Sequence, residues 1–261
     1  MIEVEDLACR FGDFEAVKGI SFRVAPGEIF AFLGPNGAGK TTTVKMLTTL
    51  LKPTRGRIRI DGLDPAEQPQ EVRRRFGIVF QDPSLDVMLT AAENLELHAA
   101  LYGVPRAERR GRIEKLLKQF ELWDKRDQTT ATFSGGMKRR LEIARGFLHT
   151  PRALFLDEPT LGLDPQSRHQ LWNHVRSVNQ SEGVTVFLTT HYMDEAERVA
   201  QRIAIVDHGK IIALGTLAEL KQQTGCDSLE AAFLKLTGTS VREESAGSAD
   251  QMRQFMKAWR R

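Results

Sequence analysis

The chain has 261 residues, of which 41% are hydrophobic and 27% charged. These values exclude bulk disorder and indicate an ordinary globular protein, with one domain and an inserted subdomain. Lysine and arginine number 37 and aspartate and glutamate 34, and the resulting net charge of +3 is too small to indicate nucleic-acid binding by itself.

The two cysteines, Cys9 and Cys226, are far apart and belong to no CxxC or Cys/His cluster. We therefore expect no disulfide partner and no cysteine zinc site. The first residues lack the pattern of a signal peptide, and no stretch approaches the roughly 18–20 apolar residues of a membrane span. We expect a cytoplasmic protein whose membrane role would come through a partner or a surface contact.

The first third of the chain reads as strands with one early helix. Alternating polarity over residues 2–5 and 20–24 predicts half-buried strands, and the mostly apolar run 28–33 predicts a strand buried on both faces. A glycine-rich loop follows, and then a helix from about residue 39 to 50. Residues 76–80 read as another buried strand.

The pattern changes after residue 83. Residues 90–149 are almost wholly helical, and Thr90 with Glu93 forms a capping-box sequence at their start. Strands return at 153–156, 184–188 and 203–206, each separated by a helix. This alternation predicts a mainly parallel sheet with helices on both faces, and the helical block reads as an insertion.

A phosphate site is indicated by the pattern GxxxxGK[ST] between a buried strand and a helix. The residues of this phosphate loop are Gly34, Pro35, Asn36, Gly37, Ala38, Gly39, Lys40 and Thr41, with Thr42 next in the helix. The glycines let backbone N–H groups wrap the phosphates. Lys40 should reach the β- and γ-phosphates, and the Thr41 hydroxyl should bind Mg²⁺.

A second strand end carries two acids, Asp157 and Glu158. Asp157 is placed to hold the Mg²⁺ shell, and Glu158 to polarise the water that attacks the γ-phosphate. Phosphoryl transfer needs this division, since metal and lysine absorb charge while another group orients the nucleophile. The sequence therefore predicts a nucleotide triphosphatase.

Ser134, Gly135 and Gly136 stand at the start of a strongly helical stretch and present a hydroxyl and free N–H groups, a second anion-binding end in the same chain. With this motif the chain resembles the ABC ATPase family over roughly residues 1–240. Phe11 lies where the family stacks an aromatic ring on adenine, and Gln81 resembles the glutamine that touches metal and water and senses the membrane partner. Asp164 lies in a segment that resembles the family's loop after the catalytic acid. His191 resembles the histidine that contacts the γ-phosphate.

The resemblance implies an α/β fold of the P-loop NTPase class, with a mainly parallel core sheet, N-terminal antiparallel strands and an inserted helical subdomain. Residues 1–85 and 151–240 would form a RecA-like ATP-binding core, and residues 86–150 the helical subdomain with the signature motif. It also implies ATP and Mg²⁺ as cofactors. Two ATP molecules would be sandwiched in a head-to-tail homodimer.

Two departures stand out, since the family's adenine-stacking residue is usually Tyr and its signature usually ends in Gln, where this chain has Phe11 and Met137. The segments 80–86 and 133–145 resemble the drug- and antibiotic-resistance branch typified by daunorubicin exporters. That branch implies a separate integral membrane permease of the ABC-2 type, no nucleic-acid partner, and a location at the inner face of the cell membrane. An importer subunit and a soluble ABC protein that does not transport are the alternatives.

Two further features carry expectations. His98, His149, His169, His174 and His208 have no metal-ligand spacing, so we expect them to be structural or solvated. Residues 241–261 read as a linker and a short amphipathic helix with a basic side. That helix could pack on the ATPase body or a second subunit, dock on the membrane or the membrane subunit, or stay disordered.

Overall fold

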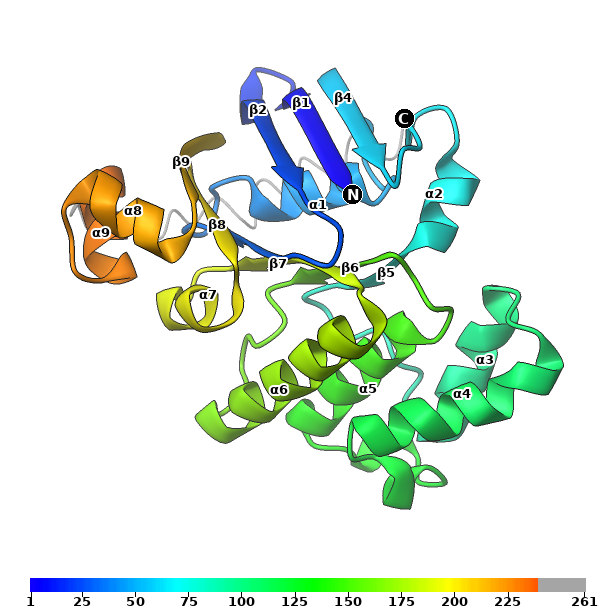
Figure 1. The fold of residues 1–261 in the computed structure, drawn as a ribbon. Helices are drawn as coiled ribbons and strands as arrows, with labels where there is room; N and C mark the ends of the chain where they lie inside the picture. Colours follow the sequence, from blue (N-terminus) through cyan, green and yellow to red (C-terminus); the bar gives the residue numbers. More distant parts are fainter. Residues whose placement is uncertain (239–261) are drawn as a thin grey trace.

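The computed structural model describes residues 1–238, so the predicted linker and helix over 241–261 lie outside the described residues. Its strands form two sheets, and the larger one lies between the smaller sheet and a layer of helices (Figure 1). The smaller is antiparallel in the order β2-β1-β4 and the larger runs β5-β6-β7-β3-β8-β9. The strands are β1 (Ile2–Phe11), β2 (Phe14–Val24), β3 (Ile29–Leu33), β4 (Arg55–Ile60), β5 (Phe76–Val79), β6 (Ala153–Asp157), β7 (Thr185–Thr190), β8 (Arg202–Asp207) and β9 (Lys210–Gly215).

All neighbours in the larger sheet are parallel except β8 and β9. This confirms the predicted fold class, a mainly parallel core sheet with antiparallel N-terminal strands. The α-helices of residues 1–238 are α1 (Lys40–Leu47), α2 (Pro69–Arg75), α3 (Ala91–Leu101), α4 (Arg106–Gln119), α5 (Gly135–Phe147), α6 (Pro165–Glu182), α7 (Met193–Val199), α8 (Leu217–Thr224) and α9 (Leu229–Thr237).

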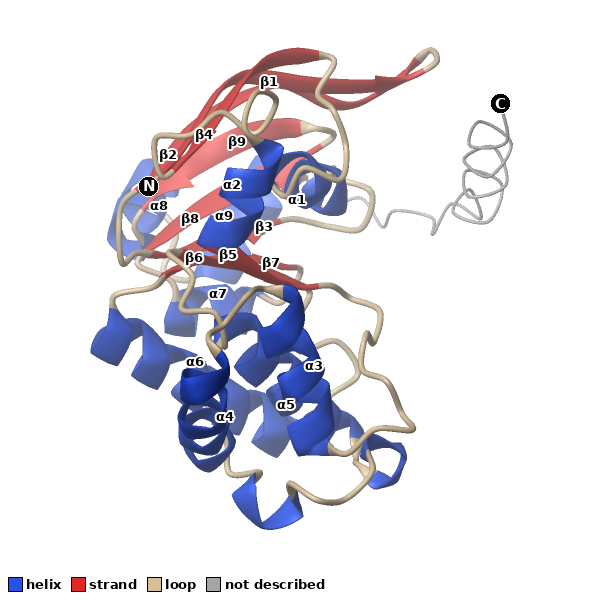
Figure 2. Ribbon diagram, turned by 90° about the vertical axis from the view of Figure 1, so that its right-hand side faces the viewer, coloured by secondary structure: helices blue, strands red, loops and turns tan. Residues whose placement is uncertain are grey.

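The two faces of the larger sheet are covered differently (Figure 2). One face packs on the helical layer through side chains such as Leu33, Leu156 and Leu188. The other packs on α1 and the smaller sheet, so a helix and a second sheet share this face. Phe30 stacks on Phe22 of β2 with ring centroids 5.6 Å apart. Aromatic residues therefore join the two sheets.

The helical block between β5 and β6 contains α3, α4 and α5, and it lies beneath the larger sheet in Figure 1. The predicted capping box is present, because Thr90 Oγ1 accepts from Glu93 N at 3.1 Å and Glu93 Oε2 accepts from Thr90 N at 2.8 Å. The subdomain limits at residues 86 and 150 stay a prediction. No helix within residues 1–238 is long and apolar enough to cross a bilayer.

Three adjacent strands end at one edge of the larger sheet. Leu33 pairs in register with Thr190, and Asp157 with Thr189. The carboxyl ends of β3, β6 and β7 therefore bring the phosphate loop, the acidic pair and the segment before His191 together. Loops at the carboxyl ends of parallel strands are where such sheets bind ligands.

Candidate active site

The phosphate loop connects β3 to α1 and can only be built from glycine at two positions. A Cβ on Gly34 would lie 2.3 Å from Val206 O, and one on Gly39 would lie 2.6 Å from Ala16 O. Gly39 also has φ = 97°, a conformation that L side chains rarely adopt. The loop thus packs against neighbouring backbone while its helix α1 begins at Lys40. Thr41 and Thr42 lie half-buried in the first turn of that helix.

Lys40 is buried, with 5% of its surface exposed. Its ammonium group donates to Gly34 O at 2.7 Å and to Pro35 O at 3.1 Å, both within the loop. It also forms an ion pair with Glu158 Oε1 at 2.9 Å. The structure therefore joins the predicted phosphate-binding cation to the predicted catalytic carboxylate.

Asp157, the last residue of β6, is tied to both neighbouring segments. Its Oδ1 accepts a hydrogen bond from Thr189 Oγ1 at 2.6 Å and from Thr41 Oγ1 at 3.3 Å. A hydroxyl and a carboxylate side by side fit Mg²⁺, which takes oxygen ligands and keeps several waters. Two of the three predicted metal ligands, Thr41 and Asp157, thus lie side by side.

Glu158 has a backbone conformation that is unusual for its type. Its φ is 49°, in the left-handed region, which costs about 1–3 kcal/mol for a residue other than glycine. Its N–H donates to Thr189 O at 3.2 Å and to Thr189 Oγ1 at 3.0 Å, which holds the turn. The turn aims the carboxylate away from the strand, between Lys40 and His191.

His191 contacts the second oxygen of the same carboxylate, with Nδ1 2.5 Å from Glu158 Oε2. Because a carboxylate accepts, the proton of this bond belongs to Nδ1. The Glu158 carboxylate consequently links one cation, Lys40, to one imidazole, His191, in a continuous chain of side-chain contacts. Such a chain fixes both oxygens of the carboxylate.

The remaining predicted site residues lie elsewhere. Ser134 caps α5 through a bond from Met137 N at 3.3 Å, and Asp164 caps α6 by accepting from Ser167 N at 3.0 Å. A Cβ on Gly136 would lie 2.8 Å from Ser167 Oγ, so the signature segment and the start of α6 are neighbours. Gly135 likewise faces Leu163, with a Cβ 3.9 Å from Leu163 Cδ2.

Gln81 is exposed, two residues after the end of β5. Phe11 ends β1, where it is half-buried against the core cluster beneath the smaller sheet. Among the described residues, Ser134, Gln81 and Asp164 are not hydrogen-bond or ion-pair partners of Lys40, Asp157 or Glu158. The chain thus assembles one half of the predicted site and presents the other residues separately.

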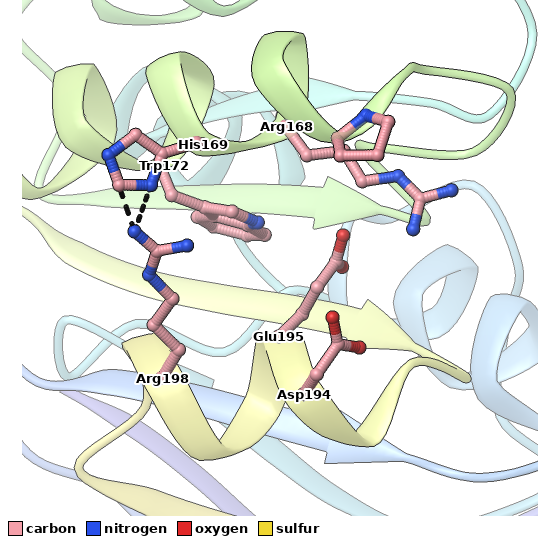
Figure 3. A pocket seen from close by; sticks show the side chains of 7 residues that line it. Arg168, His169, Trp172, Asp194, Glu195 and Arg198 are labelled. Carbon is pink, nitrogen blue, oxygen red and sulfur yellow. Dashed lines mark hydrogen bonds between the residues drawn. The ribbon is translucent and has the colours of Figure 1, made fainter.

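Two residues that no sequence motif indicated, Arg168 and Glu195, support the site from behind. Arg168 of α6 donates through Nε to Leu163 O at 2.9 Å, and its guanidinium lies 4.2 Å from the centre of the Tyr192 ring. It thereby ties the loop before α6 to the loop that holds His191. Arg168 and Glu195 line a pocket of about 190 Å³ between α6 and α7 (Figure 3).

Glu195 supports the same loop from α7. It is buried, and its Oε2 accepts from Thr190 Oγ1 at 3.2 Å. Burial raises the pKa of this carboxyl, and hydrogen bonds from Thr160 and Thr190 oppose the rise. Neither Arg168 nor Glu195 has a sequence signal of its own, because both contacts depend on how α6 and α7 pack.

Comparison with known proteins gives the family. Residues 17–161 match the ABC transporter family model. The chain is 46% identical to the daunorubicin/doxorubicin resistance ATP-binding protein DrrA of Streptomyces peucetius, over 94% of this chain and 73% of that protein. It is 42% identical to the Nod factor export ATP-binding protein I of Paraburkholderia xenovorans, over 88% of this chain and 75% of that protein.

Solved structures agree. An ATP-binding subunit of an ABC transporter superposes with a TM-score of 0.82 at 36% identity, covering 90% of this chain and 99% of that chain. The dimeric ATP-binding cassette MJ0796, bound to ADP and Pi, gives a TM-score of 0.74 at 28% identity, covering 83% of this chain and 99% of that chain. The chain therefore belongs to the ABC transporter family and is one of its ATPases.

Proposed function

We propose that this ATPase powers an exporter, and that it acts as a dimer on a separate integral membrane permease. The observation that carries the hydrolytic role is the placement of the Glu158 carboxylate between Lys40 and His191, at the carboxyl end of β6. The export role is supported by relatives that are named for resistance to daunorubicin and linearmycin and for Nod factor export.

Each residue of the site has a distinct task in this proposal. The loop from Gly34 to Gly39 and the side chain of Lys40 hold the phosphates, and Thr41, Asp157 and Gln81 hold Mg²⁺, which neutralises phosphate charge when bound. Glu158 orients and polarises the attacking water, and His191 contacts the γ-phosphate. Lys40 exchanges its bond to Glu158 for phosphate oxygens, which frees one carboxylate oxygen for the water.

The second half of each site comes from the partner subunit in a head-to-tail dimer. Ser134, Gly135 and Gly136 bind the phosphates of the ATP held by the other subunit, and Asp164 contacts the bound nucleotide. Phe11 stacks on the adenine of the ATP that its own subunit holds. This assignment is supported by the helix N-terminus at Ser134, where free N–H groups and the helix dipole favour an anion. The helical subdomain of residues 86–150 presents that end to the partner.

The permease, of the ABC-2 type, docks beside Gln81 in this proposal. Large apolar side chains are exposed on the segment that follows Gln81 and on α3, among them Met88 with 78% and Leu101 with 74% of their surface exposed. Leu97 and Leu101 are one helical turn apart on α3, and adjoining exposed apolar groups mark interaction surfaces. Docking there places the ATPase at the inner face of the membrane, where it powers efflux of a drug, an antibiotic, a lipid or a polysaccharide.

Replacement of Glu158 by Gln tests the hydrolytic role. The amide keeps the size of the side chain but loses the charge that polarises water, so we expect Mg²⁺-dependent ATP hydrolysis to fall by roughly 10²–10³-fold or more. ATP binding should persist, and size-exclusion chromatography with ATP should show a stable dimer. Near-wild-type turnover of the variant would remove Glu158 from this role.

The export role is tested separately, with this chain and its permease reconstituted together in vesicles. Candidate cargo should raise ATP hydrolysis by the complex and leave hydrolysis by the isolated subunit unchanged. Cargo accumulation should require ATP on the side where the subunit is bound. Movement of cargo toward the ATPase side would favour an importer instead.

A further inference from the structure

A buried arginine lies in α5, the helix that begins at the signature motif. It does not contact the phosphate loop, yet it contacts the backbone of the segment that holds Asp157 and Glu158. Arg139 of α5 is 7% exposed. Its Nε donates to Pro159 O at 2.7 Å, and its Nη2 donates to Asp157 O at 3.2 Å and Glu158 O at 3.4 Å. One guanidinium thus binds three consecutive carbonyl groups, those of the metal ligand, the catalytic acid and the residue after it.

The same guanidinium reaches the strand that precedes Gln81. Arg139 Nη1 donates to Phe80 O at 2.5 Å and to Glu142 Oε2 at 3.1 Å, so it joins α5 to the end of β5. The other oxygen of Glu142 accepts from Ser84 N at 2.6 Å and from Ser84 Oγ at 3.2 Å. The backbone on both sides of Gln81 is therefore bound to the helix that begins at the signature motif.

Packing alone does not explain a charged residue at this place. A buried ion pair is often no more stabilising than apolar residues of similar volume, whereas a planar guanidinium can hold several oxygens in fixed directions. Burial lowers the pKa of Arg139, and the carboxylate of Glu142 is the main opposing influence. The contacts of Arg139 thus fix the positions of the carbonyl groups that it binds, and they need not stabilise the fold more than apolar packing would.

We propose that Arg139 is a positioning residue for ATP hydrolysis. It fixes the backbone of Asp157 and Glu158, and the strand end before Gln81, in register with the signature helix α5. This inference rests on the proposed hydrolytic function and adds a residue that acts through Glu158. Because Arg139 does not contact the phosphate loop or Lys40, its loss should slow turnover and leave nucleotide affinity nearly unchanged.

The test compares Arg139→Lys with Arg140→Lys. A lysine at 139 keeps the charge but cannot serve carbonyls on two separate segments at once. Arg140 is a matched control, since it is adjacent in sequence and donates instead to Phe120 O and Glu121 Oε2 at the far end of α4. We expect Arg139→Lys to lower kcat at least tenfold with the Kd for MgATP within twofold of wild type, and Arg140→Lys to change both by less than twofold.

A second variant covers the case in which Arg139→Lys is too unstable to purify. Glu142→Gln keeps the shape of the side chain but removes the charge that holds Arg139, so a smaller loss of kcat at unchanged Kd is expected. Wild-type kcat in the variant that can be measured would overturn the inference. So would losses of kcat and affinity in equal proportion together with a lower Tm, which indicate a merely structural role. A wild-type chain without Mg²⁺-dependent hydrolysis would instead overturn the proposed function itself.

Discussion

His98, Tyr102 and His149 form a stack of rings where the end of α3 meets the residues after α5. Tyr102 lies 4.4 Å from the His98 ring and 4.1 Å from the His149 ring, measured between centroids. Burial lowers the pKa of His98 to about 3 and that of His149 to about 4. Both histidines are therefore neutral in the folded protein at pH 7, and His149 Nε2 donates to Phe76 O at 3.0 Å.

This stack should make the folded state sensitive to acid. Both pKa values are lower in the folded than in the unfolded chain, so the unfolded chain binds more protons below about pH 6.5. The contribution of the two neutral histidines to the unfolding free energy is complete above that pH. It is lost as the pH falls toward 4 for His149 and toward 3 for His98. Each histidine adds up to about 1.4 kcal/mol per pH unit to the slope of the unfolding free energy.

Urea unfolding of His149→Phe between pH 7 and 5 tests this. Phenylalanine keeps an aromatic ring at this position but has no group that binds a proton. The slope of unfolding free energy against pH should therefore be shallower than in wild type, whatever the absolute stability. Tyr102→Phe keeps the ring and both imidazoles, and its slope should match wild type. Equal slopes in wild type and His149→Phe would refute the assignment.

Single residues differ in how far the sequence could predict their place in the site. Lys40, Thr41 and Asp157 belong to local motifs whose spacing implies their chemistry, and the structure brings them together. Thr189 belongs to no such motif, and Arg139 lies in a segment whose pattern does not imply its contacts. Thr189 binds Asp157 only because β6 and β7 are adjacent in the sheet, and Arg139 contacts Glu158 only because α5 packs beneath it.

Among the elements, strands that are buried on both faces and capped helices were predicted well, and helix ends and edge strands less so. The helix after the phosphate loop was expected to reach residue 50 but ends at Leu47. Thr48 Oγ1 binds back to Val44 O, and Thr49 has φ = 64°, which turns the chain out of the helix. The edge strand β9 was not predicted, because it is defined by its pairing with β8, and that pairing depends on the fold.

Helix α5 and strand β5 are in direct backbone contact. A Cβ on Gly77 would lie 2.1 Å from Gly146 O, so the two glycines let helix and strand backbones touch. Gly77→Ala must push α5 off the sheet, and we expect a loss of about 1–3 kcal/mol of unfolding free energy. Impaired ATPase activity should accompany this loss, since α5 carries Arg139 and the signature motif.

Gly111 is the matched control for that substitution. It lies inside α4, and a Cβ there would meet no atom within 4 Å. Gly111→Ala should raise the unfolding free energy by about 0.5–1 kcal/mol, because alanine loses less backbone entropy in a helix. Denaturant titration of both variants decides the matter, and a Gly77→Ala variant as stable as wild type would contradict the close contact.

At the scale of the whole molecule, the proposed dimer divides each site between two subunits. Lys40 and Glu158 form an ion pair within one chain, whereas Ser134 caps α5 in a separate part of the same chain. Lys40→Ala therefore damages the site of its own subunit, and Ser134→Arg damages the site of the partner. Each homodimer of either variant has two damaged sites.

Mixing the two inactive variants should restore activity. In a heterodimer of Lys40→Ala with Ser134→Arg, both lesions fall in one site and the other site is intact. Random exchange gives half heterodimers, so about one quarter of the wild-type number of sites should return. Lys40→Ala mixed with Glu158→Gln is the control, because these lesions damage one site each and leave no intact site. Equal recovery in the two mixtures, or none in the first when heterodimers are shown to form, would contradict a shared site in which each half can turn over independently.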